Sequence, residues 1–199
     1  YGPWYEAYRP TEEVLEKQRK RSWKYHPKIS IVVPAYKTPE TFLREMMDSL
    51  RGQTYDNWEL CIANASPDDA SMEFTLKEYA SMDGRIIWKK LDRNLGIAEN
   101  TNAAFDMATG DYVGLLDHDD LFAPNALYEI ASALEKERDI DVIYTDEDKV
   151  RADLSEHFQP HLKPDFNLDL LRANNYICHL FAVKRDIMKQ TGGFRREFD

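Results

Sequence analysis

The chain has 199 residues, of which 43% are hydrophobic, and its formal net charge is -10 at pH 7. A chain of this length and composition can bury a hydrophobic core, and it favours one domain, with or without an appendage. The negative charge argues against nucleic acid as the main partner, because binding to a phosphate backbone needs a surplus of lysine and arginine. Any phosphate site must therefore be local.

Neither cysteine content nor hydropathy indicates a secreted or membrane-spanning protein. Cys61 and Cys178 lie far apart within apolar runs, so we expect two buried thiols and no disulfide framework or Cys-rich metal site. No stretch approaches the ~20 apolar residues that cross a bilayer, and the start of the chain lacks the pattern of a signal peptide. We therefore expect a cytoplasmic protein. The start without Met and the end directly after "TGGFRREF" favour a piece of a longer polypeptide.

Residues 10–28 form the first predicted element, a helix with acidic residues in its first turn and basic residues in its last. The helix dipole prefers this order, and Pro27 is expected to end the helix. The segment is the most basic of the chain, so a solvated helix face is favoured, with docking to a partner or the inner face of the membrane as the alternative. We interpret 1–27 as a basic N-terminal helical extension and 28–199 as the main domain.

Short apolar runs and helical stretches alternate over the rest of the chain. Five runs rich in β-branched and aromatic residues have the length of strands, at 28–34, 58–64, 85–91, 111–117 and 139–145. Helices are predicted at 39–53, 68–82 and 124–137 from the spacing of their apolar residues. This order favours an α/β fold with a mainly parallel, Rossmann-like sheet covered by helices on both faces.

Unusual side chains collect where the predicted strands end. In open sheets of this kind, ligands bind beyond the carboxyl ends of the strands. The residues at these ends are Pro34, Ala35 and Tyr36, then Asn64, then Arg93, Asn94 and Gly96, and finally Asp117, His118, Asp119 and Asp120. We therefore expect a binding site along this edge.

The segment "GDYVGLLDHDD", residues 110–120, places three carboxylates within four positions. Like charges this close repel one another unless a cation lies between them. The chain has no Gly-rich dinucleotide or P-loop motif, so Mg²⁺ or Mn²⁺ held by carboxylates is the favoured means of neutralising a diphosphate. An acidic turn that caps the next helix is the alternative. His118 is left out, because alternation along the strand points it away from its neighbours.

Four segments, taken in their order along the chain, resemble glycosyltransferase family 2 in the GT-A fold. They are "ISIVVPAYKTPETFLREMMDSLRGQTYDNWELCIANAS", "RNLGIAENTNAAFDMATGDYVGLLDHDD", "KPDFNLDLLRANNYICHLFAVKRD" and "TGGF". The resemblance covers residues 28–199. It implies a metal-dependent, inverting transferase that moves a sugar from a UDP- or dTDP-sugar to a glycan or lipid-linked glycan in cell-surface polysaccharide or lipopolysaccharide biosynthesis.

The resemblance also implies roles for individual residues. Asp119, supported by Asp120, would hold Mn²⁺ or Mg²⁺, and Asp117 would contact the ribose of the donor. The other predicted residues of the nucleotide-sugar site are Pro34, Ala35, Tyr36, Asn64, Arg93, Asn94, Gly96 and His179. Of these, His179 is a candidate for the acceptor side. Alternatives stay open: Tyr36 as a ring covering the sheet edge, Asn64 as a turn or cap residue where the family has Asp, and His179 as a core histidine. Asn102 is interpreted as structural, holding its helix against the strands.

The catalytic base of the family follows a turn like Gly192-Gly193-Phe194, so the expected base lies beyond Asp199. Asp146 and Asp148 in "YTDEDKV" are the candidates within the chain, with a solvated turn as the competing interpretation. The sequence leaves two alternative functions open. One is a noncatalytic module that binds a nucleotide sugar or glycan, and the other is a sugar-phosphate nucleotidyltransferase, which the Gly-free turn "VVPAYKTPE" disfavours.

Overall fold

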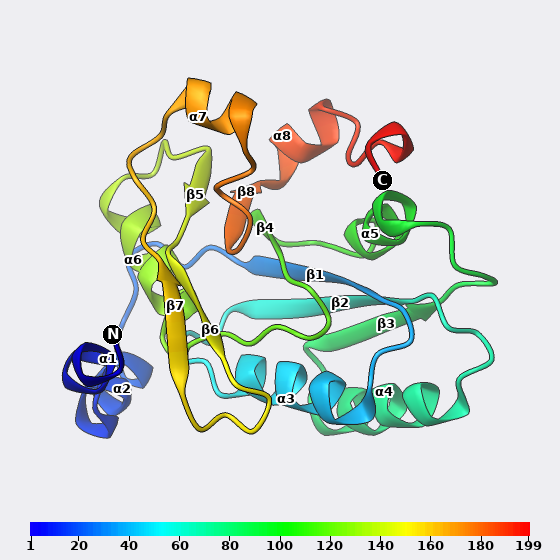
Figure 1. The fold of residues 1–199 in the computed structure, drawn as a ribbon, viewed down its shortest axis with the longest axis horizontal. Coiled ribbons are helices and arrows are strands. Elements are labelled where there is room, and N and C mark those ends of the chain that lie inside the picture. Colours follow the sequence, from blue (N-terminus) through cyan, green and yellow to red (C-terminus); the bar gives the residue numbers. More distant parts are fainter.

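The computed structural model describes residues 1–199, in which helices and strands alternate over most of the chain (Figure 1). The helices are α1 (Gly2–Tyr8), α2 (Glu12–Arg19), α3 (Glu40–Arg51), α4 (Ala70–Met82), α5 (Ile97–Phe105), α6 (Ala126–Lys136), α7 (Leu168–Ala173), α8 (Arg185–Gln190) and the 3₁₀ turn η1 (Arg196–Phe198). The strands are β1 (Ile29–Ala35), β2 (Trp58–Asn64), β3 (Ile86–Lys90), β4 (Tyr112–Leu115), β5 (Val142–Tyr144), β6 (Glu147–Val150), β7 (His157–His161) and β8 (Phe181–Lys184). None of the helices combines the length and apolar character needed to cross a membrane.

Six strands form the main sheet, in the order β3-β2-β1-β4-β8-β5. Strands β3, β2, β1 and β4 run parallel to one another, whereas β8 is antiparallel to both of its neighbours. Ala35 is paired with Asn64 at the ends of β1 and β2, so these two strands end at the same edge of the sheet. Strands β6 and β7 form a separate antiparallel pair.

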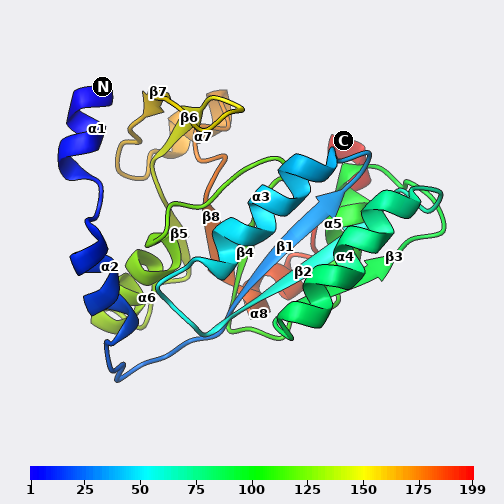
Figure 2. The same ribbon diagram turned by 90° about the horizontal axis from the view of Figure 1, so that it is seen from below.

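Helices cover both faces of the sheet, as predicted, and the two faces bury separate clusters of side chains (Figure 2). The larger cluster, of 25 buried residues, joins alternate residues of β1 and β2 to α3, α4 and α6. The smaller cluster, of 10 residues, takes the intervening positions, such as Val32 and Cys61, and joins them to α5 and α8. Because side chains alternate across a strand, these strands, which are buried on both faces, supply both layers.

The five predicted strands and the three predicted helices between them are confirmed, as β1 to β5 and as α3, α4 and α6. The prediction of one helix over 10–28 is wrong: α2 ends at Arg19, and a further helix, α1, precedes it. Glu135 of α6 explains the early end. Its carboxylate accepts hydrogen bonds from the backbone N–H groups of Lys24 and Tyr25 and lies 2.5 Å from the Arg21 guanidinium. These contacts use backbone N–H groups that a continuing helix would need for its own hydrogen bonds.

A buried acidic network closes the amino-terminal edge of the sheet. The Glu59 carboxylate, on β2, lies 2.5 Å from Lys28 Nζ and accepts hydrogen bonds from Ser30 Oγ and from the backbone N–H of Thr109. Only 5% of Glu59 is exposed. A side chain at Gly110 would come within 2.6 Å of the Lys28 carbonyl oxygen, so the absence of Cβ lets the turn before β4 approach β1 closely.

Replacing Glu59 with Gln is expected to lower the free energy of unfolding by about 1–3 kcal/mol at neutral pH, because donors placed for a carboxylate lose their partner. Burial raises the pKa of Glu59, but the hydrogen bonds from Lys28, Ser30 and Thr109 outweigh burial and hold the pKa below its usual range. A lowered pKa stabilises the fold above the ordinary carboxyl pKa of about 4.3, and this contribution is lost as the pH falls through the lowered value.

Urea denaturation at pH 7 and in acid measures this difference, which should shrink in acid. Glu13→Gln is the control, because it removes only an exposed pair with Lys17 and should change stability little. A Glu59→Gln variant as stable as the parent chain at pH 7 would contradict the assignment.

Candidate active site

The edge of the sheet where β4 ends brings two distant segments together. Strand β8 lies antiparallel beside β4, with Leu115 paired with Phe181. The residues that follow β4 therefore lie next to the residues that precede β8. This places Asp117 and Asp120 beside His179.

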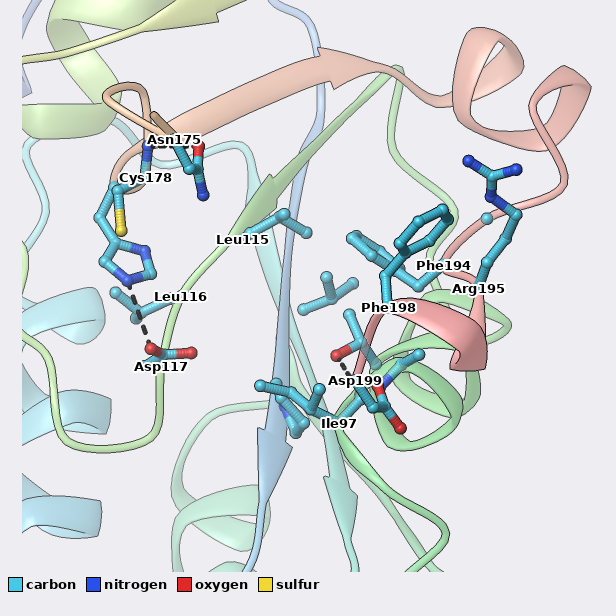
Figure 3. Close-up of a pocket in the computed structure, with 16 residues that line it drawn as sticks. Ile97, Leu115, Leu116, Asp117, Asn175, Cys178, Phe194, Arg195, Phe198 and Asp199 are labelled. Atoms are coloured by element: carbon cyan, nitrogen blue, oxygen red, sulfur yellow. Dashed lines mark hydrogen bonds and ion pairs between the residues drawn. The ribbon is translucent and has the colours of Figure 1, made fainter. Parts of the chain in front are cut away.

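Asp117, Asp120 and His179 form a compact group of candidate metal ligands. Their ligand atoms all lie within 4.8 Å of one another. His179 Nε2 is 3.2 Å from Asp117 Oδ2 and 3.6 Å from Asp120 Oδ2. Figure 3 shows the Asp117 carboxylate at the end of this interaction, at one side of the cavity. The geometry thus supports a histidine that faces the carboxylates rather than one satisfied in the core.

The group holds more negative than positive charge. The hydrogen bond from His179 lowers the pKa of Asp117, and the same bond raises the pKa of His179. Burial raises the pKa of Asp120, and the nearby carboxylates of Asp117 and Asp119 add to this effect. One imidazole does not neutralise these carboxylates, so a bound divalent cation would be stabilised here.

Asp119 lies outside this group. The predicted metal ligands are Asp119 and Asp120, whereas the structure brings Asp120 together with Asp117 and His179. The Asp119 side chain is 55% exposed, and its Oδ1 lies 3.9 Å from His118 Nδ1. His118 is also outside the group, in agreement with leaving it out. Asp120 belongs to the group together with Asp117 and His179, while ligation by Asp119 stays a prediction.

A cavity of about 510 Å³ opens beside Asp117 (Figure 3). Its walls come from the ends of β1 and β4, the start of α5, the loop before β8 and the end of the chain. The lining residues are Val32, Pro34, Ile97, Ala98, Thr101, Leu115, Leu116, Asp117, Asn175, Cys178, His179, Gly193, Phe194, Arg195, Phe198 and Asp199. Half of these 16 residues are hydrophobic, and charged side chains lie at both sides of the cavity, with Asp117 at one side and Arg195 and Asp199 at the other (Figure 3). A mixture of apolar walls and a few polar groups is typical of a small-molecule site.

The predicted residues at the ends of β1 and β2 divide into exposed and buried ones. Tyr36 is 39% exposed, so its ring is free to contact a ligand. Pro34 lines the cavity. Ala35 and Asn64 have no exposed surface. Asn64 Oδ1 accepts a hydrogen bond from Ser66 N, which is the turn-residue alternative considered for it.

The loop before α5 is held by its own side chains. Asn94 Oδ1 accepts hydrogen bonds from Gly96 N at 3.1 Å and from Asn100 Nδ2 at 2.8 Å. Gly96 has a φ of 96°, a conformation that favours glycine. Arg93, in contrast, is exposed on this loop. The structure thus gives Asn94 and Gly96 a part in shaping the loop and leaves Arg93 available for a ligand.

Asn102 connects α5 to the turn at residues 192–194. Its Nδ2 donates to the Phe194 carbonyl oxygen, and its Oδ1 accepts from Phe194 N, both at 2.8 Å. The structural interpretation of Asn102 therefore holds, but its partner is this turn rather than the strands. The contact fixes Phe194, which forms part of the cavity wall.

Asp146 and Asp148 do not line the cavity. Asp146 Oδ1 accepts a hydrogen bond from Lys163 N at 2.7 Å. Asp148 Oδ2 accepts one from Tyr1 Oη at 2.7 Å and lies 2.9 Å from His157 Nδ1. Both carboxylates therefore anchor other segments of the chain. Asp146 is exposed in the turn between β5 and β6, whereas Asp148 lies in strand β6 and is partly buried.

Several cavity residues were not assigned a role from the sequence, because they come from segments whose elements were not predicted. Asn175 and Cys178 belong to the loop before β8, and Phe194 and Phe198 to the end of the chain. The expectation that both cysteines are buried is wrong for Cys178, which is exposed, whereas Cys61 is buried. The apolar run around Cys178, "NYICHL", forms a loop at the cavity and not a core strand.

Comparison with known proteins agrees with this architecture. The sequence model of "Glycosyl transferase family 2" matches residues 30–192. The O-antigen biosynthesis protein RfbC of Myxococcus xanthus is 32% identical over 199 residues, which cover 100% of this chain and 16% of that protein. The chain thus spans less than a fifth of the length of this relative.

Two solved structures share the fold at low sequence identity. The mannosyltransferase PcManGT of Pyrobaculum calidifontis, in complex with GDP-Man and Mn²⁺, has a TM-score of 0.62 and 20% identity over 91% of this chain and 53% of that chain. S. aureus TarS 1-349, in complex with UDP-GlcNAc, has a TM-score of 0.66 and 17% identity over 84% of this chain and 48% of that chain. The chain belongs to glycosyl transferase family 2, and its sheet and helices form the GT-A fold.

Proposed function

We propose that this chain binds a nucleotide-diphosphate sugar at the carboxyl edge of the sheet and serves its transfer to a glycan acceptor. The observation that carries the proposal is the group of Asp117, Asp120 and His179 beside a cavity of about 510 Å³. Membership of family 2 supports the transferase class. Similarity to RfbC supports an acceptor in O-antigen or a related surface polysaccharide.

The donor set fits a divalent cation, and we assign Mn²⁺ ahead of Mg²⁺. Carboxylates suit both ions, but Mg²⁺ prefers a shell of oxygen ligands, whereas an imidazole is better accepted by a transition metal. Asp120, Asp117 and His179 would hold the ion. When bound, it would supply positive charge to a diphosphate. The Mn²⁺ complex of PcManGT, which has the same fold, supports this assignment.

The chain's own side chains would bind and orient the rest of the donor. The ring of Tyr36, which is partly exposed, would stack on the base, and the exposed Arg93 would pair with a phosphate. Buried Ala35 and Asn64 would act by shaping this edge, since neither has exposed surface. The apolar walls around Phe194 would exclude water from the reacting sugar.

A general base would take the proton of the acceptor hydroxyl. Asp146 and Asp148 remain candidates for this role, although each carboxylate already accepts a hydrogen bond from a neighbouring segment. Donor binding and base catalysis can therefore be tested separately. A noncatalytic module would bind the donor without acceptor-dependent transfer.

Calorimetry with UDP, dTDP and GDP tests the proposal. We expect one of these nucleotides to bind in the presence of Mn²⁺ and to lose most of its affinity in excess chelator. Equal affinity with and without chelator would contradict the proposed role of the cation. Acceptor-dependent release of the nucleotide from its sugar then distinguishes a transferase from a binding module.

A further inference from the structure

The ammonium group of Lys163 is buried beneath the loop that carries His179. Its side chain is 1% exposed, which is rare for lysine because removing the charge from water is costly. Lys163 does not line the cavity. Its partners indicate what it does.

Lys163 Nζ holds the loop at residues 175–180 by two backbone carbonyl groups. It donates to the carbonyl oxygen of Ile177 at 2.6 Å and also to that of His179. These two carbonyls flank Cys178, which faces the cavity with Asn175 (Figure 3). A charged donor makes stronger hydrogen bonds than a neutral one, so the loop is fixed at the residue that faces the carboxylates.

Glu147 completes the arrangement from strand β6. Its Oε2 lies 3.6 Å from Lys163 Nζ and accepts a hydrogen bond from His179 N at 3.3 Å. Its Oε1 lies 2.9 Å from His161 Nδ1. The backbone of His179 is thus held on both sides, with its N–H on Glu147 and its C=O on Lys163.

The ring of His179 contacts Asp117 through Nε2, but its other nitrogen has no such support. Its Nδ1 is buried and has no hydrogen-bond partner. A metal-binding histidine is normally oriented by a hydrogen bond from its second ring nitrogen. Here that bond is missing, so the direction of the ring depends on how firmly its backbone is held.

We propose that Lys163 and Glu147 are positioning residues, a buried pair that holds the His179 backbone so that its imidazole faces Asp117 and Asp120. This inference rests on the proposed function for its consequence in metal binding, but the effect on the loop can be measured without any ligand. Lys163 and Glu147 touch neither of the two carboxylates and act through His179.

The test compares Lys163→Met with Lys184→Met, a matched control whose ammonium pairs with Asp141 and is one-third exposed. We expect Lys163→Met to speed hydrogen exchange of the amides at residues 175–180. We also expect it to weaken Mn²⁺ binding, measured by electron paramagnetic resonance of the free ion, by about 10- to 100-fold. Lys184→Met should change neither quantity.

A double-mutant cycle with His179→Ala separates positioning from general loosening of the fold. If Lys163 acts through His179, Lys163→Met adds no further loss of Mn²⁺ affinity in the His179→Ala background. An equal loss in both backgrounds, or exchange and affinity like those of the parent chain, would overturn the proposal.

Glu147→Gln decides the question if Lys163→Met does not fold, because it keeps the size of the side chain and removes only the charge. It should also speed exchange at residues 175–180, and unchanged exchange would count against the pair. If the parent chain binds no Mn²⁺, the proposed function fails. The exchange experiment then still reports whether Lys163 fixes the loop.

Discussion

Asp120→Asn is expected to weaken Mn²⁺ binding by more than ~100-fold, because it removes a direct ligand and not only a supporting group. Binding of a nucleoside diphosphate in the presence of Mn²⁺ should fall with it. Without metal, the same change should raise the unfolding midpoint. Asp120 is a partly buried carboxylate beside Asp117 and Asp119, and burial and these neighbours raise its pKa, so its negative charge destabilises the fold at neutral pH. Titration calorimetry and thermal unfolding measure the two effects.

Asp119→Asn is the matched control, since Asp119 is adjacent in the chain and also partly exposed but lies outside the ligand group. We expect it to keep most of the Mn²⁺ affinity. If Asp119→Asn instead loses as much affinity as Asp120→Asn, Asp119 is a ligand, as the family resemblance implies. Opposite changes in binding and stability for Asp120→Asn are the signature of a functional charge that the fold tolerates at a cost.

Gly193→Ala is expected to destabilise the chain by about 3 kcal/mol. Gly193 has a φ of 73°, where a side chain is strained, and its added Cβ would come within 2.6 Å of Asn102 Oδ1. The two hydrogen bonds between Asn102 and Phe194 would then be disturbed. For a chain of this size, the loss corresponds to a drop in the unfolding midpoint of roughly 6–12 °C. Thermal unfolding followed by circular dichroism measures it.

The neighbouring Gly192 supplies the control for this change. It has a similar φ of 82°, but nothing lies within 4 Å of an added Cβ. Gly192→Ala should therefore show only the backbone strain, about 1 kcal/mol. Equal losses for the two variants would mean that the contact with Asn102 contributes nothing to the fold.

The strands and the helices that cover them could be predicted because their hydrophobic periodicity is local. Apolar runs such as those of β1 and β2 are long enough to be recognised as strands from the sequence. The carboxyl ends of parallel strands lie at the same edge of the sheet. This reasoning placed Asp117 and Asp120 at the site. It could not show that Asp120 lies closer to His179 than Asp119 does, because that depends on the turn after Leu115.

The parts that could not be predicted depend on contacts between distant segments. Nothing in the local sequence indicates that β8 lies between β4 and β5. Nor does it indicate that Glu135 of α6 accepts hydrogen bonds from the N–H groups of Lys24 and Tyr25, within the predicted helix, which ends early. Lys163 resembles any surface lysine in the sequence, because its burial depends on carbonyl groups of a loop before β8. Single polar residues become informative only when their partners are known.

The antiparallel position of β8 has a consequence for the order in which the molecule can assemble. Asp117 and His179 are 62 positions apart in the chain, so the ligand group exists only after a long segment has closed back onto the sheet. Such closure is entropically costly and slow compared with the pairing of strands that are near in sequence. Strands β1, β2 and β3 can therefore form a sheet before the site exists. A ligand that binds this group would in turn favour the docked arrangement of β8 by mass action, so this edge of the sheet would be a late part of the folded state that ligand binding stabilises.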